Sequence, residues 1–116
     1  MSIATFEDII AWQKSKLLAV WVYREFGALK DYGFRDQILR ASVSIMNNIA
    51  EGFDRGSNKE LKHFLVIARG SAAEVRSMLM LAEELGYTSR DIKQLEDVKE
   101  ISRLLTGFIK SLNLLL

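Results

Sequence analysis

Apolar side chains recur along this chain at steps of three and four residues, the spacing that places them on one side of an α-helix. The pattern is clearest before Gly86, where small and apolar residues form one stripe: Leu61, Phe64, Leu65, Ala68, Ala72, Val75, Leu79 and Ala82. A second clear stripe follows at Leu95, Val98, Ile101, Leu105, Phe108, Ile109 and Leu112. Both segments are therefore predicted to be long helices with one face in a core.

Glycines and capping residues divide the chain into four predicted helices with short connections. Ser57 and Glu60 match a capping box, with Glu60 reaching back to the N-cap Ser57, and Gly86 supplies a stop. The predicted ranges run from Thr5 or Asp8 to about Phe26, from about Phe34 to Ala50 or Glu51, from Ser57 to about Leu85, and from a cap within Thr88–Asp91 to about Leu114. Short connections favour antiparallel neighbours, so we predict an all-α fold, an up-down-up-down antiparallel four-helix bundle in one domain over residues 1–116.

The second predicted helix carries more apolar surface than one core-facing stripe requires. Its first stripe is Phe34, Ile38, Ala41, Ile45 and Ile49. Its second stripe, centred roughly 100° away, is Leu39, Val43, Met46, Ala50 and Phe53. The first and third helices also carry apolar residues outside their main stripes: Ile10, Trp21, Ile67, Met78, Met80 and Leu81.

This excess has two interpretations. Hydrophobic residues scattered singly over a surface are normal, whereas contiguous extra stripes more often mark an interface between subunits. Closed homo-oligomers are the usual result of such an interface. We therefore predict self-association, with these candidate interface residues: Trp21, Leu39, Val43, Met46 and Phe53.

The remaining side of the second helix carries polar residues that form one ridge: Gln37, Arg40, Ser44, Asn47, Asn48, Glu51 and Arg55. Two interpretations stay open, a recognition or polar-network site and a solvated helix face. Asn is a poor helix former, so the adjacent Asn47 and Asn48 favour burial and hydrogen bonding of at least one of them. Glu74 on the third helix is expected to pair with Arg40 or Asn48 across the helix interface.

The side chains of these 116 residues include few catalytic groups. There is no cysteine, which excludes disulfides, thiolate metal sites and cysteine nucleophiles. The only histidine, His63, is expected on the outer side of its helix. Glu60 and His63 match the Glu-x-x-His pattern of di-metal bundles in letters only, because no second copy exists. We therefore predict a protein that is not an enzyme and that has no catalytic residues, cofactor or metal.

Charge is nearly balanced, with 16 basic and 15 acidic side chains and a net charge of +1. Such a balance does not favour strong binding to nucleic acid but leaves room for a local basic patch. The candidate nucleic-acid contacts are Arg40, Arg55, Lys59, Lys62 and Arg69. The sequence shows neither a signal peptide nor an apolar run of roughly 18 residues, so we expect a cytoplasmic protein with no membrane partner.

Several motifs resemble those of one known family. They are Phe6–Ile9 with Trp12 and Gln13, the run QILRASVSIMNNIAEGFDR over residues 37–55, FLVIARGS over residues 64–71 with Glu74, and Leu85–Tyr87. The chain is similar over nearly its whole length to the four helix bundle proteins encoded in intervening sequences of bacterial 23S ribosomal RNA genes, often labelled S23 ribosomal protein. The resemblance implies an up-down bundle that assembles as a ring-shaped homopentamer, and it carries over no catalytic residue.

The family that this chain resembles has a relative, the accessory protein of diversity-generating retroelements. That protein is a pentamer that engages a reverse transcriptase and nucleic acid with a strongly basic surface, and this chain departs from it in its near-zero net charge. The first functional prediction is therefore a non-enzymatic, homopentameric scaffold or interaction protein. The alternative is an accessory protein that binds RNA or DNA through a basic surface repeated by symmetry.

Overall fold

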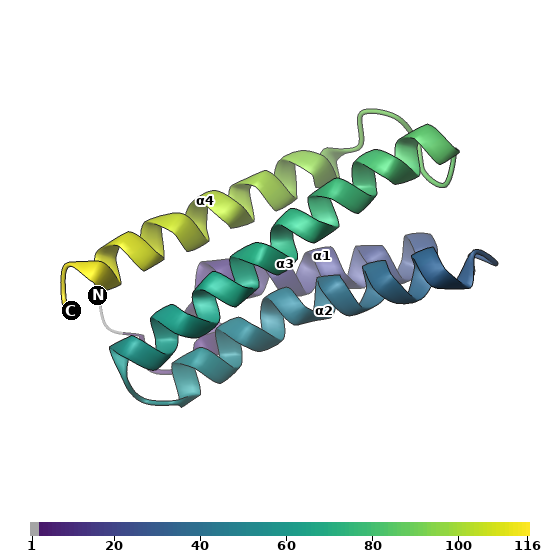
Figure 1. Cartoon of the computed structure of the whole chain (residues 1–116). Coiled ribbons are helices and arrows are strands. Elements are labelled where there is room, and N and C mark those ends of the chain that lie inside the picture. The colour runs from purple at the N-terminus through teal and green to yellow at the C-terminus, as the bar shows by residue number, and fades with distance from the viewer. Residues whose placement is uncertain (1–2) are drawn as a thin grey trace.

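The computed structural model describes residues 3–116, so residues 1–2 of the predicted domain lie outside the described residues. The described part contains one short 3-10 helix, four α-helices and no strand: η1 Phe6–Asp8, α1 Ile10–Phe26, α2 Tyr32–Asp54, α3 Asn58–Leu85 and α4 Lys93–Asn113. Successive α-helices run in opposite directions and form an elongated bundle measuring 45 × 21 × 19 Å (Figure 1). The predicted all-α, up-down four-helix bundle is confirmed.

The core is one continuous cluster to which every α-helix contributes. Its largest fully buried side chains include Phe26, Ile38, Ile45, Ile49, Leu65, Leu79, Ile101 and Leu105. The stripe predicted on α3 is buried except for Phe64, and the stripe predicted on α4 is buried except for Leu95 and Phe108, which are half-buried. Met78 was expected outside the main stripe of α3, but it is only 8% exposed, because its side of the helix borders the stripe. The helical periodicity therefore identified most of the core.

The observed helix boundaries show which of the predicted capping residues begin and end the helices. Ser57 is the N-cap of α3 as predicted, with its Oγ accepting a hydrogen bond from the backbone N–H of Glu60 at 3.1 Å. The predicted capping box is only half formed within residues 3–116, because the Glu60 side chain makes no hydrogen bond back to the N–H of Ser57. The start of α2 was predicted too late, because Asp31 is its N-cap and accepts from the N–H of Phe34 at 3.2 Å. Its end was predicted too early, since the helix continues through Gly52 to Asp54.

The predicted cap of α4 was wrong. The helix begins at Lys93 after Ile92, whose side chain makes no capping hydrogen bond. Thr88 instead donates from Oγ1 to Glu25 at 2.5 Å, and Asp91 adopts a positive φ of 54°. Thr88 therefore holds the loop against the end of α1 and is not available to cap the next helix.

The beginning of α2 is tied to the loop that follows α3. Tyr87 donates from its hydroxyl to Asp31 Oδ2 at 2.7 Å, and its ring packs edge-on against Phe34 at 5.2 Å. The hydrogen bond from Tyr87, and then that from the N–H of Phe34, lower the pKa of Asp31 below its ordinary value of 3.8. Asp31 therefore joins two segments that are far apart in the sequence.

Gly52 marks a close approach of α2 and α3. A Cβ at this position would lie 2.6 Å from the Cβ of Phe64 and 3.4 Å from the carbonyl oxygen of Leu61. No side chain fits at the first distance, so the glycine allows the α2–α3 spacing even though glycine weakens a helix interior.

The variant Gly52→Ala is expected to destabilise the protein by about 1–3 kcal/mol, because α3 must shift to admit the methyl group. The matched control is Gly70→Ala within α3, where a Cβ would meet no atom within 4 Å. That control is expected to stabilise the fold by roughly 0.5–1 kcal/mol through helix propensity. Thermal or urea unfolding followed by circular dichroism measures both changes. Equal stability of the two variants would show that the close approach at Gly52 carries no strain.

The variant Tyr87→Phe is expected to raise the pKa of Asp31 toward 3.8, because the main hydrogen bond to the carboxylate is lost. A carboxylate whose pKa is lowered by folding stabilises the fold above its unfolded pKa, and this stabilisation is lost as the pH falls through its folded pKa. Stability in the variant should therefore depend less on pH below about pH 4. Carboxyl titration by NMR checks the pKa, and Tyr32→Phe, at an exposed ring beside Arg35, is the control.

Candidate functional site

The polar ridge of α2 divides into two sides. Ser44 and Asn48 face α3, where the hydroxyls of Ser44 and Ser71 lie 2.8 Å apart. Asn48 donates from Nδ2 to the carbonyl and hydroxyl oxygens of Ser44 at 2.8 and 3.0 Å. All three side chains are half-buried, so the adjacent asparagines do include one that is partly buried and hydrogen-bonded, namely Asn48. This side of the ridge fixes how α2 packs on α3.

Glu74 has a different partner from the one predicted. Its Oε2 accepts a hydrogen bond from Gln37 Nε2 at 3.0 Å, and neither Arg40 nor Asn48 contacts it. The prediction was wrong because Gln37 lies on the α3 side of α2 beside Glu74. Arg40 is turned about 60° away from Gln37 toward the outer hollow, and Asn48 lies about three turns further along the helix. The Gln37–Glu74 bond is exposed and adds a second polar link between the two helices.

The other residues of the ridge are exposed. Arg55 pairs with Glu51 at 2.8 Å and lies over the ring of Phe64 at 5.0 Å, and its pKa is raised mainly by the hydrogen bond to Glu51. Arg40 and Asn47 make no side-chain hydrogen bond or ion pair within residues 3–116. The outward side of the ridge is therefore open to a partner, while the inner side serves packing.

Apolar side chains remain on the outer surface where α1 and α2 meet. Val20 and Tyr23 on α1 are 39% and 50% exposed, and Leu39, Val43 and Met46 on α2 are half-buried. Shallow hollows along this seam are lined by these residues together with a rim of polar side chains: Lys16, Arg24, Asp36, Arg40 and Asn47. We call the five apolar residues the α1–α2 face.

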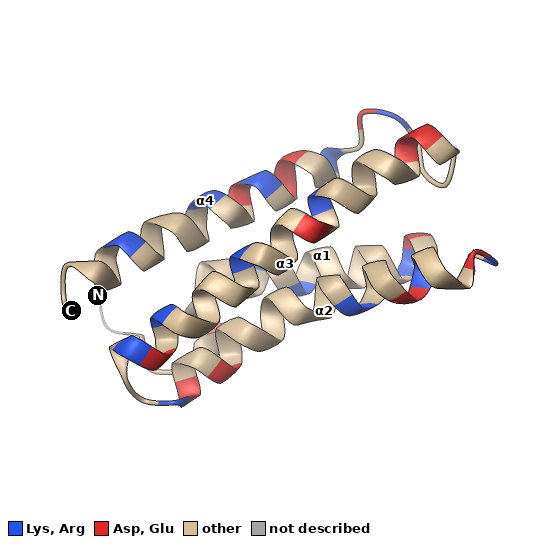
Figure 2. Cartoon of the chain, viewed as in Figure 1, with Lys and Arg blue, Asp and Glu red and all other residues tan. Residues whose placement is uncertain are grey.

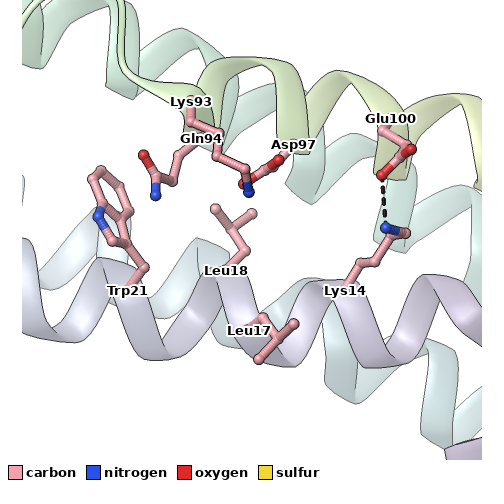
Figure 3. A pocket seen from close by; sticks show the side chains of 8 residues that line it. All are labelled: Lys14, Leu17, Leu18, Trp21, Lys93, Gln94, Asp97 and Glu100. Atoms are coloured by element: carbon pink, nitrogen blue, oxygen red, sulfur yellow. Dashed lines mark hydrogen bonds and ion pairs between the residues drawn. The ribbon is translucent and has the colours of Figure 1, made fainter.

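Two of the candidate interface residues lie elsewhere. Phe53, near the end of α2, is half-buried against the core. Trp21 projects from the other side of α1 toward α4 (Figure 3). Its ring meets Phe26 edge-on at 5.7 Å. The structure therefore brings Leu39, Val43 and Met46 together but separates them from Trp21, since α1 stands between them.

The hollow beside Trp21 has a volume of about 190 Å³ and is bounded by α1 and α4 (Figure 3). Lys14 reaches across it to Glu100 at 2.9 Å, and this hydrogen bond lowers the pKa of Glu100. Lys93 pairs with Asp97 at 3.2 Å on the same helix. Both lysines at the hollow therefore pair with carboxylates.

The five candidate nucleic-acid contacts are spread along the bundle. Arg55, Lys59 and Lys62 lie near the turn between α2 and α3, but Arg40 points outward from the middle of α2. Arg69 turns toward α4 and donates from Nη1 to Thr106 Oγ1 at 3.3 Å. Figure 2 shows basic residues in the middle of α3 and along α4, away from that turn.

The structure reveals a second group of basic residues that was not among the candidates predicted from the sequence. Arg76 on α3 and three residues of α4, Lys99, Arg103 and Lys110, line one groove. The α4 residues follow steps of four and seven, so the helical periodicity used for the core could have identified this basic stripe. The stripe was not predicted because a net charge of +1 for the whole chain gives no sign of a local excess of positive charge on one helix face.

His63 is exposed, as predicted, and its ring lies against Phe64. Across residues 3–116, no three His, Asp or Glu side chains gather where they could hold a metal ion. The same part of the chain holds no helix with both the length and the apolar character needed to cross a membrane.

Comparison with known proteins gives two results that agree with this architecture. The family model described as "23S rRNA-intervening sequence protein" matches residues 7–107. The crystal structure of a protein of unknown function from the S23 ribosomal protein family of Bacteroides thetaiotaomicron VPI-5482 is similar, with 29% sequence identity and a TM-score of 0.78. The alignment covers 87% of this chain and 96% of that chain. No curated protein matches the chain. These matches confirm the resemblance seen in the sequence motifs, and neither description states an enzymatic activity.

Proposed function

The chain belongs to the 23S rRNA-intervening sequence protein family, and from this premise we propose that it is a non-enzymatic scaffold that assembles with copies of itself. The observation that carries the proposal is the α1–α2 face. Five apolar side chains from two helices lie together there at the surface, although the bundle already has a complete core.

The composition of this face suits a contact between proteins. An apolar centre surrounded by a polar rim is the usual anatomy of a protein–protein interface. The rim holds Arg24 and Arg40 as well as Asp36, so the cations of one copy can meet the carboxylate of another. A rim with both charges can find complements of either sign on another surface of a second copy, and we take that copy as the partner.

The number of copies we propose is five, the number that the family resemblance implies. In a ring, each subunit contacts two neighbours through two different surfaces. The α1–α2 face supplies one of these surfaces, and the apolar residues on the outer side of α3, which include Ile67 and Leu81, are candidates for the other.

Association with RNA or DNA is the second proposal. It is supported by the uneven placement of cations, which form a local group on α3 and α4 despite the net charge of +1. Ring symmetry would repeat that group, and several weak sites on one particle can bind a long polyanion together.

The paired substitutions Val43→Glu and Met46→Glu are expected to convert the assembly to monomers, because charges would be buried at the centre of the contact. Both side chains are half-exposed in a single subunit, so the helix content and the melting of the isolated bundle should change little. Light scattering coupled to size exclusion measures the mass.

Ile10→Glu is the matched control, since Ile10 is 53% exposed at the start of α1, outside both surfaces proposed for the ring. It should leave the mass unchanged. A wild-type protein with the mass of one chain at micromolar concentration would refute self-association. An assembly that survives both glutamates would place its interface elsewhere.

A further inference from the structure

The outer surface between α3 and α4 carries a groove with an unusual set of side chains. Its lining residues are Arg76 from α3 and, from α4, Lys99, Ser102, Arg103, Thr106, Gly107 and Lys110. Four of the seven are cations, two carry hydroxyls and none is a carboxylate. Arg76, Arg103 and Lys110 are exposed, so their charges are available to a partner in water.

The helices set the cations in rows. Lys99, Arg103 and Lys110 share one side of α4 and span roughly 16 Å at a rise of 1.5 Å per residue. Arg69 and Arg76 lie two turns apart on the facing side of α3. Arg69 reaches across to Thr106, which places a fifth cation at the edge of the groove.

Two carboxylates approach these cations but leave most of the charge uncompensated. Glu96 pairs with Lys99 at 3.2 Å. Glu100 is held by Lys14 on the α1 side of α4, and Arg103 adds only a lesser, through-space contribution to the lowered pKa of Glu100. Arg76 and Lys110 make no ion pair within residues 3–116.

From this arrangement we propose that the α3–α4 groove binds the phosphodiester backbone of a nucleic-acid duplex. The inference rests on the second proposed function, nucleic-acid association, and assigns it a site different from the α2–α3 turn. Arginine forks and hydroxyls are the groups that proteins commonly offer to phosphate oxygens.

The chemistry of the groove favours a nucleic acid over an acidic protein segment. Its lining has no aromatic or large apolar side chain, which a protein partner would need as an anchor. Between the two rows of cations, α4 lines the groove with the short side chains of Ser102 and Thr106. A backbone contact needs charge alone, and without aromatic side chains for stacking, single strands gain no advantage over duplexes.

The test measures retention of a duplex of roughly 20 base pairs, as RNA and as DNA of the same sequence, by the full chain at low salt. The double variant Arg76→Glu with Arg103→Glu should bind at least about tenfold more weakly. The control variant, Arg55→Glu with Lys59→Glu at the α2–α3 turn, changes the net charge equally and should stay within about threefold of the wild type. The double variant Arg76→Lys with Arg103→Lys keeps both positive charges and should bind like the wild type. Light scattering verifies that all variants assemble to the same mass.

The outcomes distinguish failure of the groove assignment from failure of nucleic-acid association as a whole. A wild-type protein that retains neither duplex would overturn both nucleic-acid association and the groove. If the turn variant loses binding as strongly as the groove variant, or more strongly, association stands and the groove assignment fails. If polyglutamate binds as tightly as the duplexes at the same salt, the site serves an acidic protein segment and the assignment to nucleic acid is wrong. A difference between the RNA and DNA arms identifies which nucleic acid supplies the phosphates.

Discussion

The packing of α2 against α3 is the constraint on which the rest of this structure depends. Apolar residues cover more than half of the circumference of α2, so hydrophobicity alone would allow several rotations of that helix about its axis. The close approach at Gly52 and the contact between the hydroxyls of Ser44 and Ser71 select one of them. In that rotation, Ile38, Ile45 and Ile49 are completely buried.

The same rotation decides what α2 leaves at the surface. Once the isoleucine stripe is in the core and the serine side faces α3, Leu39, Val43 and Met46 must border α1 at the outside of the bundle. The polar groups between helices thus act chiefly as determinants of orientation. A half-buried hydroxyl pair adds only about 1 kcal/mol, but the contact between Ser44 and Ser71 requires this rotation of α2.

The surfaces proposed for self-association and for phosphate binding lie on different sides of the bundle. The α1–α2 face is apolar with a rim of both charges, which fits contact with another copy. The α3–α4 groove is basic and has small side chains along its length, which fits a polyanion. Because the two surfaces share no residue, assembly and phosphate binding can coexist on one subunit. A near-neutral net charge is compatible with this arrangement, because unpaired cations gather in one groove while other cations pair with carboxylates elsewhere, as at Lys14–Glu100 and Arg55–Glu51.

The four helices, most of their core residues and the cap of α3 could be predicted from the sequence, because they follow from local periodicity and from contacts three or four residues apart. It missed Asp31 as a cap and assigned Glu74 the wrong partner. Only the tertiary structure separated Trp21 from Val43 and Met46 and brought Arg76 beside Arg103. These arrangements depend on how each helix is rotated against its neighbours. Periodicity defines positions within one helix and cannot supply the relative rotation of two.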